Sequence, residues 1–433
     1  MNNDDLIEIK NAINNFNNYH KTTLPLCAAE NIVSPFVRLP LDGNYQERYI
    51  MGGTNNYDIY DNFIGSQHLL PFYSLIENRC KELFNANYAD SKTLSGMNCV
   101  TTILMSLTKI NDRILLLSED SGGHPSVIEI CKRLGLNYKY IPFDYHNYDI
   151  DYEQLNQLIY SFKPDYICIA PSDIIFPYSI ENIELGDSIL LYDASQILGF
   201  IAGNAAINPL NCSDNIVLFG GTHKTIPGPT HGIILTNNKT IYDKLDYSIS
   251  PKYIRNTQMN QVISLLFALT EFKEYGAAYT QSIIRTANEL ANELEKQDLC
   301  IAKKESVFSK THQIFIKCTE TQMNTIYHNS ILCNVTLNKK ERRLFGGFGI
   351  RLGVQEITRY NWNYDALKKV SEIIHLLSQE PFQETKCNKL VNTLPKKSIK
   401  YTFSNEVISY IMNNWILFNS LLSAFFNNIA IPL

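Results

Sequence analysis

Five short apolar runs between residues 113 and 235 limit the possible folds of this chain more than any other feature. Helical patterns alternate with them, and each run is continuously apolar rather than alternating in polarity. The runs are Arg113–Leu117, Tyr166–Ala170, Ile189–Tyr192, Ile216–Phe219 and Gly232–Leu235. Such runs are typical of strands that are buried on both faces. Strands alternating with helices predict an α/β fold, in which helices cover both faces of a sheet.

The chain is longer than one typical domain, because its 433 residues exceed the usual length of roughly 100–200. We expect an N-terminal helix and arm, a large α/β domain, a linking helix and a small C-terminal domain. Their ranges are 1–60, 61–255, 256–300 and 301–433.

Further elements follow from local patterns. We expect helices over Asp4–Tyr19, over 257–297 and from Tyr364, and small-domain strands at Gln313–Lys317 and Leu332–Thr336.

Composition argues against several kinds of partner. The net charge is −5 and no long basic block occurs, which disfavours nucleic acid. The ten cysteines show no CxxC pair or zinc-ligand spacing, so we expect free thiols and no metal site. The polar start Met1–Asp5 is unlike a signal peptide, so we expect a cytoplasmic protein.

The last segment, Val407–Leu433, is apolar but is interrupted by asparagines. We expect a helix that packs on the body or on a partner subunit. A membrane-spanning helix and a membrane-surface helix are the less favoured alternatives.

Lys224 and Asp193 form the most informative chemical pair in the sequence. Asp193 ends the apolar run Ser188–Asp193, and Lys224 lies between an apolar strand and the turn Ile226–Pro229. A lysine that can form a Schiff base and a carboxylate that can hold a pyridinium nitrogen are what pyridoxal phosphate requires. Ligands of such sheets bind at the carboxyl ends of the strands, where both residues are expected.

Two segments are candidates for holding other parts of this cofactor. Ser95, Gly96 and Met97 precede a helix, where backbone N–H groups can bind a phosphate, although an ordinary capped helix start has the same pattern. His124 follows two glycines, and its imidazole can stack on a flat ring or have a structural role.

Two charged residues are candidates for substrate chemistry. Arg351 lies among apolar residues, where it could bind a substrate carboxylate or form a structural salt bridge. Glu47 lies beside aromatic residues and could move a proton, or could be a surface residue that pairs with Arg48.

Together and in this order, the motifs resemble the serine hydroxymethyltransferase family of fold-type-I pyridoxal-phosphate enzymes, over about residues 24 to 360. The matching segments are Leu26–Asn31, Asn44–Glu47 with Gly52–Gly53, Ser95–Gly96, Gly122–His124, Ala170–Ser172, Asp193, Thr222–Thr225 and Ile350–Gly353.

The resemblance implies a large domain with a mostly parallel seven-stranded sheet and a smaller C-terminal α/β domain. It also implies roles for individual residues. The catalytic residues are Lys224, Glu47 and His124. The cofactor-binding residues are Gly52, Gly53, Ser95, Gly96, Met97, His124, Ser172, Asp193, Gln196, Thr222, His223 and Lys224. The substrate-binding residues are Glu30, Tyr49 and Arg351.

The family also builds its site across a dimer interface. The resemblance therefore implies a homodimer in which Glu47 or the Gly52–Gly53 loop serves the site of the neighbouring subunit.

Departures from the family pattern concern the substrate and folate side of the site. Ala29 and Gln196 replace a serine and a histidine, and Pro229–His231 lacks the usual arginine. The loop after Glu47 and the segment Asn338–Gly349 are short.

We therefore expect a folate-independent aldol-type enzyme that acts on a β-hydroxy-α-amino acid or glycine, with an aldehyde as partner. The alternatives are folate-dependent hydroxymethyl transfer, transamination or decarboxylation, and a non-catalytic protein that binds pyridoxal phosphate.

Overall fold

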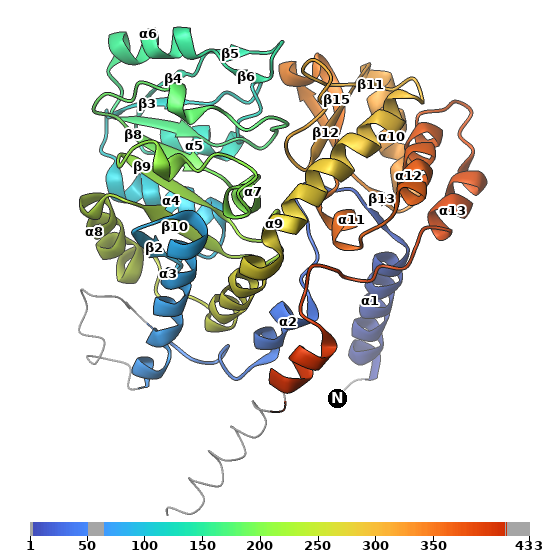
Figure 1. Ribbon diagram of the computed structural model, residues 1–433, viewed down its shortest axis with the longest axis horizontal. Coiled ribbons are helices and arrows are strands. Elements are labelled where there is room, and N and C mark those ends of the chain that lie inside the picture. The colour runs from blue at the N-terminus through green and yellow to red at the C-terminus, as the bar shows by residue number, and fades with distance from the viewer. Residues whose placement is uncertain (1–2, 51–64, 412, 414–433) are drawn as a thin grey trace, which may run out of the picture.

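The structure is a computed structural model that describes residues 3–50, 65–411 and 413. Figure 1 shows a large sheet and a smaller sheet on either side of one long helix, α9 (Met259–Glu295). Within the described part of the chain, no helix is both long enough and apolar enough to span a membrane.

The large sheet has seven strands in the order β2-β10-β9-β8-β7-β3-β4. Their bounds are Tyr88–Asp90, Gly232–Thr236, Ile216–Gly221, Ile189–Asp193, Tyr166–Ile169, Arg113–Leu116 and Asn137–Tyr140. Strand β10 runs antiparallel to its neighbours β2 and β9, and the other neighbouring strands are parallel. The mostly parallel seven-stranded sheet is therefore confirmed, and the five apolar runs form five of its strands.

Alternate side chains of these strands enter two different hydrophobic cores. Leu115 and Leu218 pack on one face, whereas Leu116 and Phe219 pack on the other. The first face is covered by α3 (Leu70–Phe84), α6 (Tyr152–Phe162), α7 (Leu198–Ala202) and α9. The second face is covered by α4 (Gly96–Leu107), α5 (Pro125–Arg133) and α8 (Lys239–Ser248). Burial on both faces explains why these strands are continuously apolar.

The small sheet is antiparallel, with the order β11-β12-β15-β14. Its strands are Cys300–Ile301, Gln313–Cys318, Gly347–Gly353 and Asn338–Arg342. The helices of this half are α10 (Glu320–Leu332), α11 (Gln355–Arg359), α12 (Tyr364–Leu377) and α13 (Glu384–Asn392). A short hairpin, β5 (Phe143–Asp144) with β6 (Asp149–Ile150), extends from the large domain.

The N-terminal segment crosses to the small half of the molecule. The predicted first helix is present as α1 (Asn3–Thr22), and α2 (Pro35–Arg38) follows the arm. Between these helices, β1 (Leu24–Pro25) pairs in parallel with β13 (Val335–Thr336). This pairing carries residues 26–31 to the junction between the two sheets.

The predicted strand at Leu332–Thr336 is wrong in its first half. Helix α10 continues to Leu332, and Asn334 then turns the chain with a φ of 52°. Only Val335–Thr336 is extended. Asparagine tolerates this left-handed conformation better than most residues, so the helix ends where the strand was expected to begin.

Two other expectations concern the cysteines and the C-terminus. All ten cysteines are free thiols, and six of them are buried. Residues 405–411 are helical, whereas the rest of the predicted C-terminal helix lies outside the described residues.

Candidate active site

The predicted site residues of the large domain meet at the carboxyl ends of three parallel strands. Asp193 is the last residue of β8. Ser172 follows β7, and Lys224 follows β9. This edge is where open α/β sheets bind their ligands, so the topology brings together residues that lie far apart in the sequence.

Lys224 is mostly buried, and Asn31 of the N-terminal arm fixes its main chain. Burial lowers the pKa of the Lys224 amine; Asp193 opposes this effect, and Arg351 adds to it. Asn31 donates a hydrogen bond from Nδ2 to the Lys224 carbonyl and another to the Tyr279 hydroxyl, at 2.9 Å. A lowered pKa increases the fraction of neutral amine, which is the nucleophilic form.

Asp193 is a buried carboxylate, and hydrogen bonds fix the residues that surround it. It accepts a hydrogen bond from the Ser195 backbone N–H at 2.8 Å, and Ser195 Oγ accepts one from Gly221 N–H at 2.9 Å. Burial raises the pKa of Asp193, while Ser195 and Lys224 act in the opposite direction. Among the described residues, no cation forms a salt bridge with it. A pyridinium N–H is a suitable partner for such a carboxylate.

The start of helix α4 is built to bind an anion. Ser95 caps the helix by accepting a hydrogen bond from Asn98 N–H at 3.1 Å. The first turn leaves the Gly96 and Met97 N–H groups without an intrahelical acceptor. A Cβ atom at Gly96 would lie 2.8 Å from Ser195 Oγ, so only glycine lets the turn approach this closely. These features fit the phosphate of the cofactor.

The Gly122–His124 turn is fixed against the segment that follows β7. Gly122 has a φ of 88°, and a Cβ atom there would lie 2.5 Å from the Asp173 carbonyl oxygen. The His124 N–H donates to the Ala170 carbonyl at 2.9 Å, and His124 Nδ1 accepts from Ser126 N–H at 3.3 Å. Burial lowers the pKa of His124, which favours an uncharged ring at this edge.

Arg351, on β15 of the small sheet, already forms the salt bridge that was one of its two predicted roles. Its Nη1 lies 2.8 Å from both the Ser172 carbonyl oxygen and Asp173 Oδ1. Its Nε and Nη2 donate to Asn338 Oδ1 at 3.2 and 2.6 Å. Because a guanidinium has five N–H groups, one on Nη2 remains available for a substrate.

Gln196 contacts a residue that the sequence did not reveal as part of the site. Gln313, at the start of β12, donates from Nε2 to Gln196 Oε1 at 3.0 Å and to the Ser172 carbonyl at 3.1 Å. Its Oε1 accepts from Ile174 N–H at 3.0 Å. A polar residue that opens an apolar strand was the only signal in the sequence for this contact.

The residues around Lys224 in the chain are also constrained. Thr222 Oγ1 donates to the Pro229 carbonyl at 2.8 Å, which closes the turn after the lysine. His223 is partly buried; burial, reinforced by Lys224, lowers its pKa to about 4. Its Nδ1 has no hydrogen-bond partner in the part of the chain that the structure describes.

Three predicted residues lie at the surface of this protomer rather than beside Lys224. Glu30 is exposed and lines a cavity of about 390 Å³ with Cys27 and Asn338. Glu47 and Tyr49 are also exposed.

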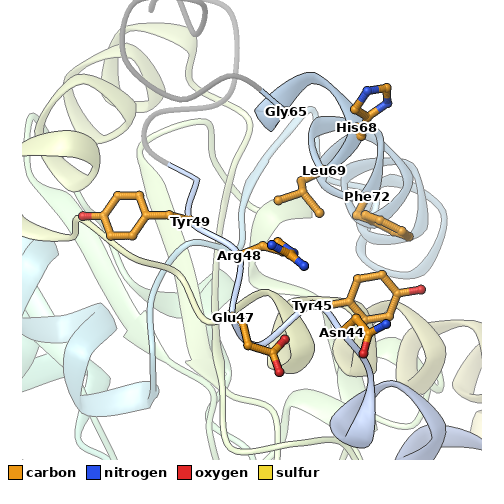
Figure 2. Close-up of a pocket in the computed structure, with 9 residues that line it drawn as sticks. All are labelled: Asn44, Tyr45, Glu47, Arg48, Tyr49, Gly65, His68, Leu69 and Phe72. Atoms are coloured by element: carbon orange, nitrogen blue, oxygen red, sulfur yellow. The ribbon is translucent and has the colours of Figure 1, made fainter. Parts of the chain in front are cut away.

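Glu47 and Tyr49 line another cavity, of about 570 Å³, together with the start of helix α3. Figure 2 shows Glu47 and Arg48 in this cavity, with His68, Leu69 and Phe72 lining the α3 side. Gly52 and Gly53 lie outside the described residues.

The donor set at the sheet edge fits pyridoxal phosphate. It offers an amine for the aldehyde, a buried carboxylate for the ring nitrogen, a helix start for the phosphate and an imidazole beside them. Within the described residues, no group of three or more His, Cys, Asp or Glu side chains could hold a metal ion.

Comparisons with known proteins point to the same chemistry. The family model described as "Serine hydroxymethyltransferase" matches residues 2–374. The chain is 30% identical to a serine hydroxymethyltransferase of Methanopyrus kandleri, over 93% of this chain and 96% of that protein. It is 27% identical to one from Methanocella arvoryzae, over 94% and 98%. Its fold is similar to that of an L-threonine transaldolase from Pseudomonas fluorescens, with a TM-score of 0.85, 20% identity, and coverage of 95% and 97%.

Proposed function

Because the chain belongs to the serine hydroxymethyltransferase family of pyridoxal-phosphate enzymes, we propose that it catalyses an aldol-type reaction of a β-hydroxy-α-amino acid or glycine without folate. The observation that carries this proposal is the meeting of Lys224 and Asp193, at the edge of the large sheet, with Arg351 of the small sheet. A lysine for the cofactor, a carboxylate for its ring and a cation for a carboxylate are together what amino-acid chemistry on this cofactor requires.

Each residue has a proposed task. Bound pyridoxal phosphate supplies an electron sink that weakens the bonds to Cα of an attached amino acid. Lys224 holds the cofactor through its neutral amine, and Asp193 holds the protonated ring nitrogen. The helix start at Ser95–Met97 binds the phosphate, and His124 contacts the ring.

The substrate is proposed to bind between the two sheets. The remaining N–H of Arg351 binds the α-carboxylate, and His124 or Glu47 takes the proton of the β-hydroxyl during cleavage. The Cα–Cβ bond then breaks and an aldehyde leaves. In the reverse direction, Cα of glycine loses a proton, bonds to the carbonyl carbon of an aldehyde, and the carbonyl oxygen gains a proton.

The absence of a folate requirement rests on the residues that differ from the family pattern. Ala29 and Gln196 change the substrate side, and Gln196 is engaged by Gln313. A transaldolase shares the fold, so transfer from one aldehyde to another is included among the proposed outcomes.

The proposal extends to a homodimer. Glu47 and Tyr49 are exposed in the single protomer, which is consistent with their serving the site of a second copy. Helix α1 also exposes large apolar side chains, including Leu6, Ile9 and Phe16. Exposed apolar surface of this kind is typical of subunit interfaces.

The first experiment tests the cofactor assignment by visible absorption. We expect the purified protein to absorb as a protein-bound pyridoxal phosphate, and Lys224→Ala to lose this band. Lys239→Ala, which changes an exposed lysine of α8, is the matched control and should keep the band. A wild-type protein that stays colourless after addition of pyridoxal phosphate would refute the assignment.

The second experiment identifies the reaction. Serine, threonine and glycine are incubated with and without aldehydes, and products are identified by mass spectrometry. We expect aldehyde release or exchange at the same rate with and without tetrahydrofolate. Acceleration by tetrahydrofolate would establish the folate-dependent alternative, and a keto acid or carbon dioxide would establish transamination or decarboxylation. No product from any amino acid would favour a non-catalytic role.

A further inference from the structure

Asp173 is a fully buried carboxylate that contacts three cations. Arg342 Nη1 lies 2.6 Å from its Oδ2, while Lys340 Nζ and Arg351 Nη1 lie 3.0 and 2.8 Å from its Oδ1. The cations come from the adjacent strands β14 and β15, and Asp173 follows β7 of the large sheet. We name these four residues the Asp173 cluster.

The Asp173 cluster has more positive charge than is needed to neutralise the Asp173 carboxylate. Three cations and one carboxylate leave two positive charges in a region where the cation side chains are only 6–14% exposed. Desolvating unpaired charge is costly, and a single cation would be enough to compensate Asp173. An α-carboxylate at Arg351 would neutralise one of these charges, and the other would remain.

The surplus charge lies beside the proposed reaction site. Arg342 Nη1 also donates to the Gly123 carbonyl at 3.2 Å, and Gly123 directly precedes His124. Lys340 and Arg342 both act electrostatically on His124, and Arg351 acts on Lys224. The cluster therefore lies next to His124 and Lys224, the residues that are proposed to act on the substrate and the cofactor.

Lys340 and Arg342 also keep unused hydrogen-bond donors. Asp173 is the one hydrogen-bond or ion-pair partner seen for Lys340 among the described residues, which leaves two of its three N–H groups. Arg342 uses Nη1 only, so its Nε and Nη2 have no acceptor in the described part of the chain. Arg342 Nε and Nη2 are not among the buried atoms that lack a partner, so both can be reached from solvent, and the Lys340 side chain is 14% exposed.

We propose that Lys340 and Arg342 bind a second anionic group of the substrate, a carboxylate or a phosphate ester that is separate from the α-carboxylate. This inference rests on the proposed function and defines its substrate class. The anion belongs either to the side chain of the amino acid or to the aldehyde. Asp173 holds the two cations in position through its two carboxylate oxygens.

The ionisation of the cluster supports this assignment. Burial would raise the pKa of Asp173, but Arg351, Lys340 and Arg342 outweigh burial and keep it below its usual value. Burial lowers the pKa of Lys340 to about 8; Asp173 opposes this shift, whereas Arg351 and Arg342 add to it. A lysine that is only partly protonated near pH 8 gains its full charge when an anion arrives.

The test compares anionic ligands with their neutral counterparts, of which aspartate and asparagine are also matched in size. Calorimetric titration of the cofactor-loaded protein measures L-aspartate against L-asparagine, and L-phosphoserine against L-serine. In a parallel arm, glycine is supplied with glyceraldehyde or glyceraldehyde 3-phosphate, and the adduct is quantified by mass spectrometry. A preference for the anionic member of about tenfold is expected, as for a charge-assisted contact. Preference in the amino-acid pairs places the anion on the amino acid, and preference in the aldehyde pair alone places it on the aldehyde.

Variants connect the preference to the cluster. Lys340→Gln and Arg342→Gln should each remove most of the preference, while binding of L-serine is retained. Lys339→Gln is the matched control, because Lys339 lies on the same strand with its side chain 43% exposed. Lys340→Arg keeps the charge and should keep the preference, which separates lost charge from lost folding.

The wild-type protein gives a test that needs no variant. The ratio of aspartate to asparagine affinity should fall as pH rises through about 8, because Lys340 loses its proton there. Asp173, Arg342, Arg351 and His124 are the charged or titratable groups that act on it.

One set of results would overturn the anion subsite, and a different result would overturn the proposed function. Equal binding of anionic and neutral members in both arms, or a preference that survives both glutamine variants, overturns the anion subsite. Failure of serine and glycine to bind the loaded protein at all overturns the proposed function instead.

Discussion

Asp193 and Lys224 are buried together, and burial shifts their pKa values in opposite directions. It raises the pKa of the carboxyl and lowers the pKa of the amine, so it favours the neutral form of both. Each also partly restores the charge of the other. A cofactor with a cationic ring nitrogen and a reactive aldehyde suits this pair, because the cation stabilises the ionised form of Asp193 that burial disfavours, and the aldehyde reacts with the neutral amine that burial favours.

Asp193→Asn tests the carboxylate alone. We expect the variant to bind pyridoxal phosphate but to lose on the order of 10²–10³-fold in turnover, as when one preorganised electrostatic partner is removed. Turnover and the visible spectrum are measured together. Asp187→Asn changes an exposed aspartate before the same strand and should have no effect. Unchanged turnover in Asp193→Asn would show that Asp193 is not the partner of the ring nitrogen.

Gly96→Ala tests the close contact at the proposed phosphate site. The added Cβ would lie 2.8 Å from Ser195 Oγ and 2.9 Å from Gly221 N, so the turn must shift. We expect weaker retention of pyridoxal phosphate during dialysis and a loss of about 1–3 kcal/mol in the free energy of unfolding. Met105→Ala, at an exposed position of the same helix, should retain the cofactor. Full retention by Gly96→Ala would place the phosphate elsewhere.

A buried ion pair away from the proposed site fixes the long helix α9. Glu271 on α9 pairs with Arg359 of α11 at 3.2 Å, and both side chains are almost fully buried. Ser34 donates to Glu271 at 2.8 Å, and Thr402 donates to it at 2.6 Å. This one carboxylate therefore connects the N-terminal arm, α9, α11 and the C-terminal segment.

Arg359→Met should destabilise the protein by about 3–5 kcal/mol, because it leaves Glu271 buried without its charge partner. Urea unfolding at equilibrium measures the change. Lys273→Met breaks an exposed pair with Glu82 and should leave the urea midpoint almost unchanged. If both variants unfold at the wild-type midpoint, the buried pair does not stabilise the fold.

The elements themselves show how far the sequence could predict the structure. Lys224, Asp193 and His124 were found because each lies at or after the end of a strand, and topology places strand ends together. Asp173 and Gln313 were not found, because the side-chain partners that place them at the site are at least 117 residues away in the sequence. Nothing local distinguishes a carboxylate that will contact three cations from one that will face water.

Because Glu47 is exposed in the single protomer, a subunit-mixing experiment can test whether the site is shared between two copies. Lys224→Ala and Glu47→Gln are prepared separately and then mixed so that subunits exchange. If the site is shared, each mixed dimer contains one site with neither change. Random exchange of equal amounts should restore about one quarter of wild-type activity. Size-exclusion chromatography confirms that the sample is dimeric.

The activity of the mixture distinguishes a site shared between subunits from a site within one subunit. If Glu47 serves its own subunit, each mixed dimer has one site that lacks Lys224 and one that lacks Glu47, and activity stays at the level of the parents. Lys224→Ala mixed with Lys224→Gln is the control, because no combination of these subunits contains an intact site.

The site lies between two sheets, and hydrogen bonds from the small sheet hold the large-domain residues. Gln313 contacts Gln196 and Ser172, and Arg351 contacts Ser172 and Asp173. A displacement of the small sheet by less than the length of one hydrogen bond would break these contacts. The geometry of the proposed active site therefore depends on the alignment of the two sheets: substitutions in the core around the small sheet that leave the protein folded can still abolish activity.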